Sequence, residues 1–302
     1  MNKDYTILSS KKINRAKWDS CIDKNDNGLI YARSVYLDYC APGWKAIVFG
    51  DYDAVFPLCI KRKYGIKFLQ SPLFTQQLGL IGEWEITFEK LMNIVFQEVR
   101  YGDISFNFLN ENISENNFQT KTNYILDLNK SYKQIHKKYK YNLKSDLIKS
   151  NKHNLSVEFG ETVEATDAYR DFLTDVNKKV SLKDFDRFCE LFKEEEFRNH
   201  FFVRKVYSSS RKLLAVSLFL IDRKRIYNLM SVTLPKGKPV NAMHFLIDSV
   251  LQEFQLTDLI FDFEGSDITG VKSFYEKFFP VNQPYYHYHF NKLPFPLNKI
   301  KR

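Results

Sequence analysis

The spacing of hydrophobic residues changes repeatedly along the chain between that of a strand and that of a helix. In the first half, short apolar runs bounded by turn residues predict strands, and apolar residues three or four positions apart predict helices. The expected strands are 5–8, 45–49, 54–60 and 103–109, and the expected helices are about 13–24, 31–40 and 85–100. Residues 50–53 are typical of a hairpin turn between two of these strands.

The second half begins with a strand at 124–128 and a lysine-rich helix. The apolar face of that helix is formed by Tyr132, Ile135, Tyr139, Leu143 and Leu147. The elements expected after it are strand 155–159, helices 164–179 and 184–198, strands 200–207, 212–221 and 225–232, helix 241–254, strand 258–263, helix 268–278 and strand 285–290. This order predicts a mixed α/β fold and disfavours a purely parallel, doubly wound one.

The stretch 262–280 places polar residues where a buried strand ends and a helix begins. Gly265 turns the chain there, and Phe274 and Phe278 lie on one face of the helix that follows. Glu264 and Ser266 are thus expected at the carboxyl end of a core strand, a position at which α/β proteins bind ligands. Packing alone requires no acid at this point.

Composition and charge narrow the class of protein. The chain has 302 residues, which favours two domains, and its 44% hydrophobic content excludes global disorder. The net charge of +9 makes an acidic partner plausible, such as nucleic acid, a phosphorylated ligand or an anionic membrane surface. Seven lysines and one acid, Asp146, lie between Lys133 and Lys152.

The cysteines and apolar runs point to a reduced, cytoplasmic protein. The four cysteines lie far apart without a CxxC pair, so we expect neither a disulfide framework nor a zinc site. The first residues lack the apolar segment of a signal peptide, and the run Leu213 to Ile221 is too short to span a bilayer. His287 and His289 share one face of the last strand, but no carboxylate or cysteine near them in sequence completes a metal set.

Several segments together resemble a known family. Three antiparallel strands, a loop, a helix, a strand, a helix and a final strand form the order of the GNAT (N-acetyltransferase) core, and SFYEKFF resembles the signature of its fourth helix. DFEGSDITGVKSFYEKFFP resembles the closing motif of the FemAB-like, peptidoglycan-bridge (FemX-type) branch. SPLFTQQLGL (71–80) and YKYNLKSDLIKS (139–150) resemble two further motifs of that branch. The resemblance implies two tandem GNAT-like domains, which we place at 1–122 and 123–302, each with a mostly antiparallel sheet flanked by helices.

The resemblance also implies a chemistry, the transfer of an acyl or aminoacyl group to an amine by a bacterial enzyme. Tyr275 is the candidate proton donor for the leaving group, although a helix tyrosine can also simply pack on a sheet. Glu264 is the candidate base, although an acid near a helix N-terminus is favourable on its own. Ser266 is either a helix cap, like Asp267, or a substrate contact. The asparagine that the family carries seven residues before the tyrosine is Ile268 here.

Further residues are assigned by the same resemblance. The loop after the third meander strand would hold the pyrophosphate of acyl-CoA through Lys236, Gly237, Lys238 and Asn241, although it reads equally well as a solvated turn and Pro239 removes one amide donor. Gln76, Gln77, Asn142 and Lys144 are candidate substrate contacts. The amides of the glutamines could also bind their own loop, and the lysine-rich helix could be only a solvated face.

Two classes of function remain open from the sequence. The first is an N-acyltransferase that uses acyl-CoA (such as acetyl-CoA) or aminoacyl-tRNA, without a metal, and acts on a cell-envelope precursor or another small amine. The second is a protein that has kept the fold and lost catalysis, binding nucleic acid through the stripe Lys133–Lys152. The sequence leaves the donor, the acceptor and the oligomeric state open.

Overall fold

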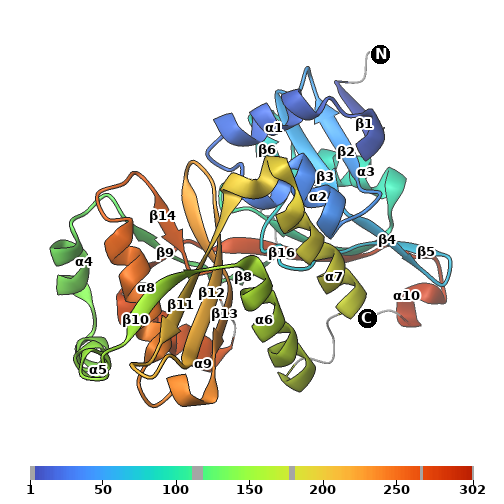
Figure 1. The fold of residues 1–302 in the computed structure, drawn as a ribbon. Helices are drawn as coiled ribbons and strands as arrows, with labels where there is room; N and C mark the ends of the chain where they lie inside the picture. Colours follow the sequence, from blue (N-terminus) through green and yellow to red (C-terminus); the bar gives the residue numbers. More distant parts are fainter. Residues whose placement is uncertain (1–3, 111–117, 177–180, 266–267, 301–302) are drawn as a thin grey trace. The chain divides into compact units, whose positions relative to one another are not determined.

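A computed structural model of the chain describes residues 4–110, 118–176, 181–265 and 268–300 (Figure 1). The chain forms two compact units. Unit 1 consists of Met1–Lys121 together with Pro284–Arg302, and unit 2 is Thr122–Gln283. The predicted second domain included the last nineteen or so residues, whereas the structure assigns them to unit 1.

The first sheet of unit 1 has four strands in the order β1-β2-β3-β6, and all its pairs are antiparallel. Its strands are β1 Tyr5–Ser9, β2 Lys45–Phe49, β3 Ala54–Leu58 and β6 Ile81–Gly82. The predicted hairpin is present, because Phe49 pairs with Ala54 across the turn.

The second sheet of unit 1 has five strands in the order β4-β5-β7-β16-β8. These strands are β4 Ile60–Lys63, β5 Ile66–Leu69, β7 Tyr101–Phe106, β16 Tyr285–Asn291 and β8 Phe118–Lys121. β16 was expected to complete the sheet of the second domain, and that prediction is wrong. It pairs antiparallel with β7 and β8 instead, and its residue Phe290 is buried in the core of unit 1.

The helices of unit 1 are α1 Arg15–Lys24, α2 Ser34–Cys40, α3 Phe88–Glu98 and α10 Leu297–Ile300. The Thr87 side chain caps α3 by accepting a hydrogen bond from the Lys90 N–H at 3.3 Å. α3 buries Leu91 and Val95 in one cluster with Phe56 of the first sheet and Phe106 of the second. One core thus joins both sheets of this unit.

Unit 2 is built on a seven-stranded sheet in the order β10-β11-β12-β13-β14-β9-β15. Its strands are β9 Tyr124–Asp127, β10 Ser156–Gly160, β11 Phe201–Tyr207, β12 Leu213–Ile221, β13 Arg225–Thr233, β14 Ile260–Asp262 and β15 Val281–Asn282. β11 to β13 form the predicted three-stranded antiparallel meander, β10 pairs antiparallel with β11, and the pairing of β13 with β14 is parallel. The predicted mixed α/β fold is confirmed.

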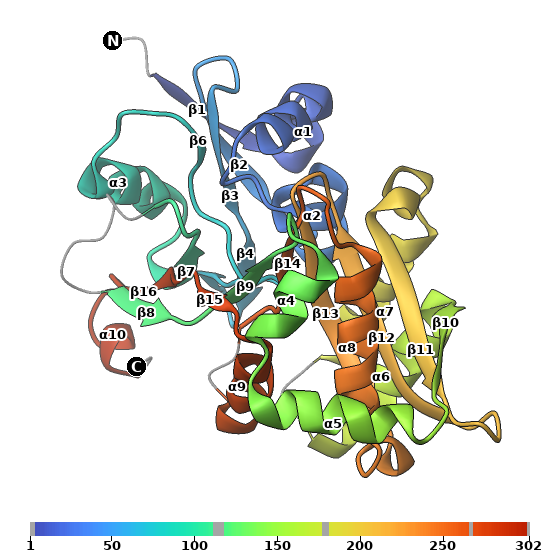
Figure 2. The same cartoon turned by 90° about the vertical axis from the view of Figure 1, so that its left-hand side faces the viewer.

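The helices of unit 2 are α4 Tyr132–Lys138, α5 Tyr141–Asn151, α6 Thr162–Val176, α7 Leu182–Glu190, α8 Ala242–Glu253 and α9 Thr269–Tyr275. α8 and α6 lie on opposite faces of the sheet (Figures 1 and 2). Leu246 of α8, Phe219 of β12, Phe261 of β14 and Leu143 of α5 belong to one buried cluster.

The single lysine-rich helix that the sequence predicts is in fact two helices, α4 and α5. Between them, the Lys140 N–H donates to the Lys277 carbonyl at 2.9 Å. The Tyr139 hydroxyl donates to Asp248 at 2.9 Å. The first contact replaces a helical hydrogen bond of the Lys140 N–H, and the second anchors the Tyr139 side chain, while the apolar residues on both sides of the break still face the same core.

Candidate active site

β13 and β14 part in the middle of the unit 2 sheet. Their last pair is Tyr227 with Asp262, where β14 ends and β13 continues. At the same point the pairing of β13 with β12 shifts by one residue, so that Asn228 and Leu229 stand opposite the single residue Phe219. Such a bulge bends the strand and redirects its side chains, and it takes the extra residue out of the regular ladder. The sheet therefore offers an irregular, partly unpaired strand segment at Asn228.

Tyr275, the predicted proton donor, lies at this point. It is the last residue of α9, and its ring packs against Phe263 with a centroid separation of 5.1 Å. Its hydroxyl is hydrogen-bonded to the Asn228 side chain. Burial, and secondly the nearby Glu264 carboxylate, raise the pKa of Tyr275. The hydroxyl therefore keeps its proton at neutral pH, as a proton donor requires.

The orientation of Asn228 determines which hydrogen-bonding role is left to Tyr275. The Ser231 hydroxyl donates to Oδ1 of Asn228 at 2.7 Å, and Ser231 is itself hydrogen-bonded to Ser217. With Oδ1 occupied as an acceptor, the amide nitrogen is the group of Asn228 that remains to donate to the Tyr275 hydroxyl, and this donation counteracts part of the rise in the pKa of Tyr275. The proton of Tyr275 is then available for a different acceptor.

Glu264, the predicted base, has an unusual backbone conformation. Its φ of 63° lies in the left-handed region, and its N–H donates to Oδ1 of Asp262 at 2.9 Å. Gly265 follows with φ 39°, and a Cβ there would come within 2.2 Å of the Thr122 carbonyl oxygen. Non-glycine residues in this region are disfavoured and concentrate at functional sites. The strained turn places the Glu264 carboxylate where it acts on Tyr275 electrostatically.

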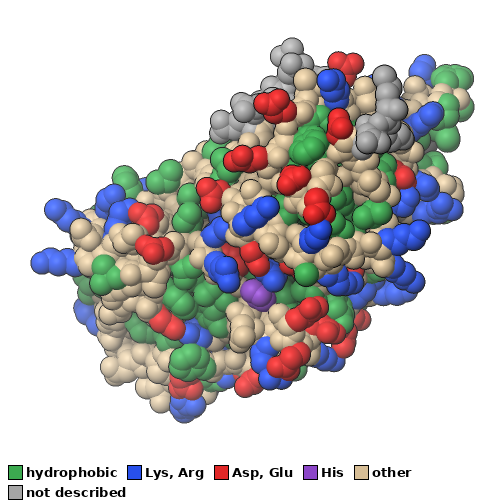
Figure 3. All heavy atoms as spheres, turned by 90° about the horizontal axis from the view of Figure 1, so that it is seen from above, with side chains coloured by type: hydrophobic (Ala, Val, Ile, Leu, Met, Phe, Trp, Pro, Cys, Tyr) green, Lys and Arg blue, Asp and Glu red, His purple; other side chains and the backbone are tan. Residues whose placement is uncertain are grey.

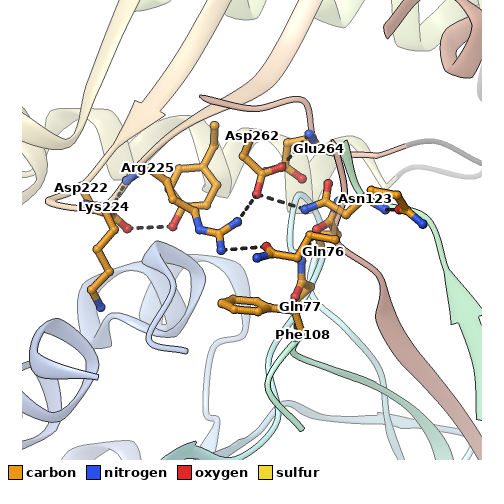
Figure 4. A network of polar contacts seen from close by, with 12 residues as sticks. Gln76, Gln77, Phe108, Asn123, Asp222, Lys224, Arg225, Asp262 and Glu264 are labelled. Atoms are coloured by element: carbon orange, nitrogen blue, oxygen red, sulfur yellow. Dashed lines mark hydrogen bonds and ion pairs between the residues drawn. The ribbon is translucent and has the colours of Figure 1, made fainter. Parts of the chain in front are cut away.

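Asp262 is the centre of a buried polar network (Figure 4). Arg225 forms an ion pair with it at 2.8 Å, and the two side chains are only 3% and 1% exposed. Asn123 donates to Oδ2 of Asp262 at 3.1 Å, and Arg225 also donates to Gln283 at 2.8 Å. Asp262 also accepts the hydrogen bond from the Glu264 N–H and thereby fixes the turn that carries Glu264.

The predicted phosphate-binding loop is only partly available. Gly237 is buried, its N–H donates to the Leu234 carbonyl at 2.8 Å, and a Cβ there would lie 2.1 Å from the Leu214 carbonyl oxygen. Asn241 turns its amide towards Asp146 at 3.4 Å. Gly237 and Asn241 therefore shape the loop, whereas Lys236 and Lys238 are exposed beside the N-terminus of α8.

His244 on α8 is a packed residue. Its ring stands 4.5 Å from that of Phe274, and its Nε2 is 3.2 Å from Lys277 Nζ. Lys277 also donates to Asp146 at 3.0 Å. Burial, reinforced by the positive charge of Lys277, lowers the pKa of His244 to about 4. The imidazole is therefore neutral at physiological pH.

Asn142 and Lys144 lie on α5. Asn142 is exposed, and its own side chain accepts a hydrogen bond from the Leu143 N–H at 2.9 Å. Lys144 donates to the Lys137 carbonyl at 2.8 Å, and Lys140 forms an ion pair with Glu276 at 3.6 Å. Part of the lysine stripe thus serves contacts within unit 2, and the binding roles of Asn142 and Lys144 stay predictions.

Gln76 and Gln77 belong to unit 1. Gln77 is 1% exposed, its carbonyl accepts from the Phe108 N–H at 3.1 Å, and its amide donates to Gln76 at 2.5 Å. Gln77 therefore ties its loop to the backbone of the segment that follows β7, and not to the backbone of the loop itself. Gln76 is partly exposed, and its role as a substrate contact stays a prediction.

Two other predictions concern Ser266 and metal binding. Ser266, like Asp267, lies outside the residues that the structure describes. Asp103 of β7 supplies the carboxylate that the sequence did not place near the histidines, with His289 Nδ1 at 2.9 Å and His287 Nε2 at 3.3 Å. Within the described ranges, no group of three or more His, Cys, Asp or Glu side chains is arranged to hold a metal ion. Among the same residues, no helix is both long and apolar enough to cross a membrane.

The chain has the fold of tandem GNAT proteins. A tandem GNAT protein from the clavulanic acid biosynthesis pathway matches it with a TM-score of 0.54 at 7% identity, over 96% of this chain and 99% of that protein. FemX matches with a TM-score of 0.67 at 11% identity, over 98% of this chain and 99% of FemX. The predicted resemblance to the FemX-type branch is confirmed at the level of the fold.

A third structure carries a bound acyl donor. Saccharomyces cerevisiae N-myristoyltransferase, solved with bound myristoyl-CoA, matches with a TM-score of 0.53 at 10% identity, over 96% of this chain and 80% of that enzyme. The sequence itself matches no protein-family model and no curated protein. At these identities the likeness defines the fold, and the activity has to be argued from the site.

Sequence reasoning missed Asn228 and the pair Arg225–Asp262. A signal was present, because Arg225 and Asn228 are polar residues in a strand whose other positions are mostly apolar. Their spacing alone could not reveal that both meet residues from 262–275, since strand order and the bulge are properties of the folded sheet.

Proposed function

We propose that the chain is an N-acyltransferase whose reaction takes place in unit 2, where β13 and β14 part. One observation carries the proposal. Glu264 in the turn after β14 and Asn228 at the bulge of β13 both act on the hydroxyl of Tyr275, the last residue of α9. A proton donor, a carboxylate and an irregular strand with unpaired backbone are the parts that acyl transfer to an amine requires.

Each residue has a defined role in this proposal. Glu264 accepts a proton from the ammonium form of the acceptor. The resulting neutral amine then attacks the acyl carbon and forms the new C–N bond. A backbone N–H of β13 near Asn228 stabilises the oxyanion that develops on the acyl carbonyl. Tyr275 gives its proton to the departing sulfur or oxygen as the bond to the acyl carbon breaks, and Asn228 orients the hydroxyl for that step.

The donor proposed is an acyl-CoA. Lys236 and Lys238 stand beside the N-terminus of α8, where orphan backbone amides and the helix dipole favour phosphate groups. Their ammonium groups would hold the phosphates as point charges, while the thioester supplies the activated acyl group. Gly237 and Asn241 contribute by shaping this loop. An aminoacyl-tRNA is the less suitable donor. The lysines of α4 and α5 would have to bind it, and part of them form contacts within unit 2 instead.

The acceptor proposed is a primary amine of a cell-envelope precursor or of a similar small molecule. The likeness to FemX supports this class of acceptor at the level of the fold. Glu264 is the group that would recognise the positive charge of such an amine before it is deprotonated.

A direct test combines ligand binding with turnover. Thermal shifts would be measured with CoA, acetyl-CoA and longer acyl-CoAs, and a ligand at about 100 times its Kd should add about 2.7 kcal/mol of stability. Acyl transfer to a panel of amines, including amino-sugar and peptide precursors, would then be followed with the acyl-CoA that binds.

The variants Tyr275→Phe and Glu264→Gln should each lower kcat by about 10²-fold or more, with little effect on folding. Tyr141→Phe, a change at a tyrosine that is 87% exposed on α5, is the matched control. Full turnover by both site variants refutes the assignment of the site. Binding of charged tRNA without any binding of acyl-CoA refutes the donor.

A further inference from the structure

The hairpin β4–β5 of unit 1 carries a concentration of positive charge. Residues 60–69 contain four basic side chains and no acidic one: Lys61, Arg62, Lys63 and Lys67. Arg62 and Lys67 stand directly opposite each other in the register, and both are exposed. Like charges that face each other directly on neighbouring strands lower the stability of a hairpin. The stability of the fold therefore does not explain this pair.

The turn of the same hairpin holds an exposed aromatic residue. Tyr64 is 89% exposed and has φ 51°, and it is followed by Gly65 with φ 78°. Turns of two residues with positive φ at both positions favour asparagine, aspartate or glycine, and a bulky side chain at the first of them is an outlier. A tyrosine at this position is disfavoured by the positive φ of its backbone and by the exposure of its aromatic ring to water.

Protection of a sheet edge explains only part of this pattern. β4 is an edge strand of its sheet, and lysines commonly guard such edges against pairing with other chains. That role does not require an aromatic ring at the tip, nor a basic residue on β5 opposite Arg62. Two local violations of the rules for hairpins, at one exposed tip, are typical of a binding element.

A second exposed aromatic residue lies on the same unit. Phe295, just before α10, is 74% exposed, and Lys299 of α10 stands over its ring at 5.5 Å. The hairpin and α10 both lie at the right-hand side of unit 1 in Figure 1, and Figure 3 shows Lys and Arg side chains gathered along that side. The surface therefore combines basic groups with apolar rings.

We propose that the β4–β5 hairpin docks this protein on an anionic lipid surface. Its basic side chains would contact the phosphate headgroups, and the ring of Tyr64 would enter the interface, where tyrosine is favoured because it has an apolar body and a polar tip. A nucleic acid is the less suitable partner. Single strands are bound along grooves with several stacking rings, whereas this hairpin presents one ring at the end of a turn.

The test uses the full chain and vesicles of phosphatidylcholine, either alone or mixed with phosphatidylglycerol. Co-sedimentation should show binding to the phosphatidylglycerol vesicles only, and binding should weaken as salt shortens the Debye length from its value of about 10 Å at 0.1 M. Replacing Arg62, Lys63 and Lys67 with alanine should weaken binding by about 100-fold, since each basic residue near an anionic surface contributes about a fivefold increase in affinity.

The matched control replaces Lys11, Lys12 and Lys90 with alanine, three exposed lysines of the same unit outside the hairpin. This control variant has the same net charge as the hairpin variant, since each loses three basic residues. It should nevertheless bind nearly as well as the original protein. Tyr64→Asn, which suits the turn, should weaken binding without harming the fold. Binding to vesicles is measured without any turnover. A negative result here therefore leaves the proposed transferase activity untouched, and a lack of transferase activity leaves this inference untouched.

Three outcomes would overturn the inference. One is no binding to phosphatidylglycerol vesicles at low salt. Another is an equal loss of binding in the control variant, which would show that net charge alone is sensed. The third is binding of bulk tRNA through the hairpin with no binding to vesicles.

Discussion

The Tyr275 hydroxyl accepts a hydrogen bond from Asn228, the first residue of β13 beyond its last pair with β14. The contact joins the C-terminal end of α9 to the one point of β13 at which its pairing is irregular. It makes the position of the proposed proton donor dependent on a side chain that has no acid–base chemistry of its own.

We predict that Asn228→Asp lowers kcat for acyl transfer by about 10²-fold, within the range that a proton-transfer group contributes. A carboxylate at this position would accept a hydrogen bond from the tyrosine hydroxyl, so the hydroxyl would turn away from the leaving group. The measurement is kcat near neutral pH, where Tyr275 is protonated in both proteins because burial raises its pKa.

Asn199→Asp, at an exposed asparagine of unit 2 to which no role is assigned, is the control for the added charge. An unchanged kcat in Asn228→Asp, with the fold intact, would show that Asn228 does not position Tyr275.

Arg225→Met should destabilise unit 2 by about 3–5 kcal/mol, because it leaves the Asp262 carboxylate buried without its cation. Urea unfolding, followed by fluorescence, measures this change. Lys193→Ala, which breaks an exposed ion pair with Glu190, should cost less than about 1 kcal/mol. A comparable effect of the two variants would contradict the central role of the Asp262 network.

The buried His244 makes stability depend on pH. Its pKa is lowered from 6.5 to about 4 in the folded protein, chiefly by burial. The unfolded chain therefore binds a proton more readily between these values, so stability is fully present above about pH 6.5 and falls as the pH decreases towards 4. At about 1.4 kcal/mol per pKa unit, the loss is at most about 3 kcal/mol.

His244→Gln has no group that titrates in this range and should flatten that part of the profile of unfolding free energy against pH. The steps that carboxylates cause should persist in the variant. An identical slope between pH 4 and 6.5 in both proteins would show that His244 is not the titrating group.

The strained turn at Tyr64 predicts a gain in stability. Tyr64→Asn should stabilise unit 1 by about 1 kcal/mol, because asparagine tolerates the left-handed conformation that disfavours most residues. Tyr64→Ala lacks the short polar side chain with which asparagine tolerates this conformation, and should show no comparable gain. Equal unfolding free energies for the asparagine and alanine variants would mean that strain at this turn is negligible.

The sequence was sufficient for much of unit 2, because β10 to β14 follow one another in the sheet in the order in which they occur in the chain. Strong local signals mark these elements, namely the apolar runs of β11, β12 and β13 and the periodicity of α8. The order of the elements and the short motifs then indicated which known fold they form. The same local signals predicted one helix over α4 and α5. Hydrogen bonds of Tyr139 and Lys140 to distant residues break it, and local periodicity carries no information about them.

The site was predictable only in part, for a similar reason. Glu264 and Tyr275 stand on a recognisable motif, and the structure brings them together. Asn228 lies nearly fifty residues earlier and reaches them through a parallel strand pair and a bulge, which depend on the register of the sheet. Gly237 and Asn241 were placed in the right loop, but the Gly237 N–H donates within that loop and the Asn241 side-chain amide donates to Asp146 of α5.

The return of β16 to unit 1 has a consequence for the ancestry and engineering of the chain. Tyr285 at the start of β16 pairs with Lys121 at the end of β8, so these strands would form an ordinary hairpin if all of 122–284 were replaced by a two-residue Asn-Gly turn. The two ends of the intervening segment also meet, because the Gln283 N–H donates to the Asn123 carbonyl at 2.8 Å. In sequence, unit 2 therefore stands at the position of a hairpin loop of unit 1, a kind of position where insertions are well tolerated.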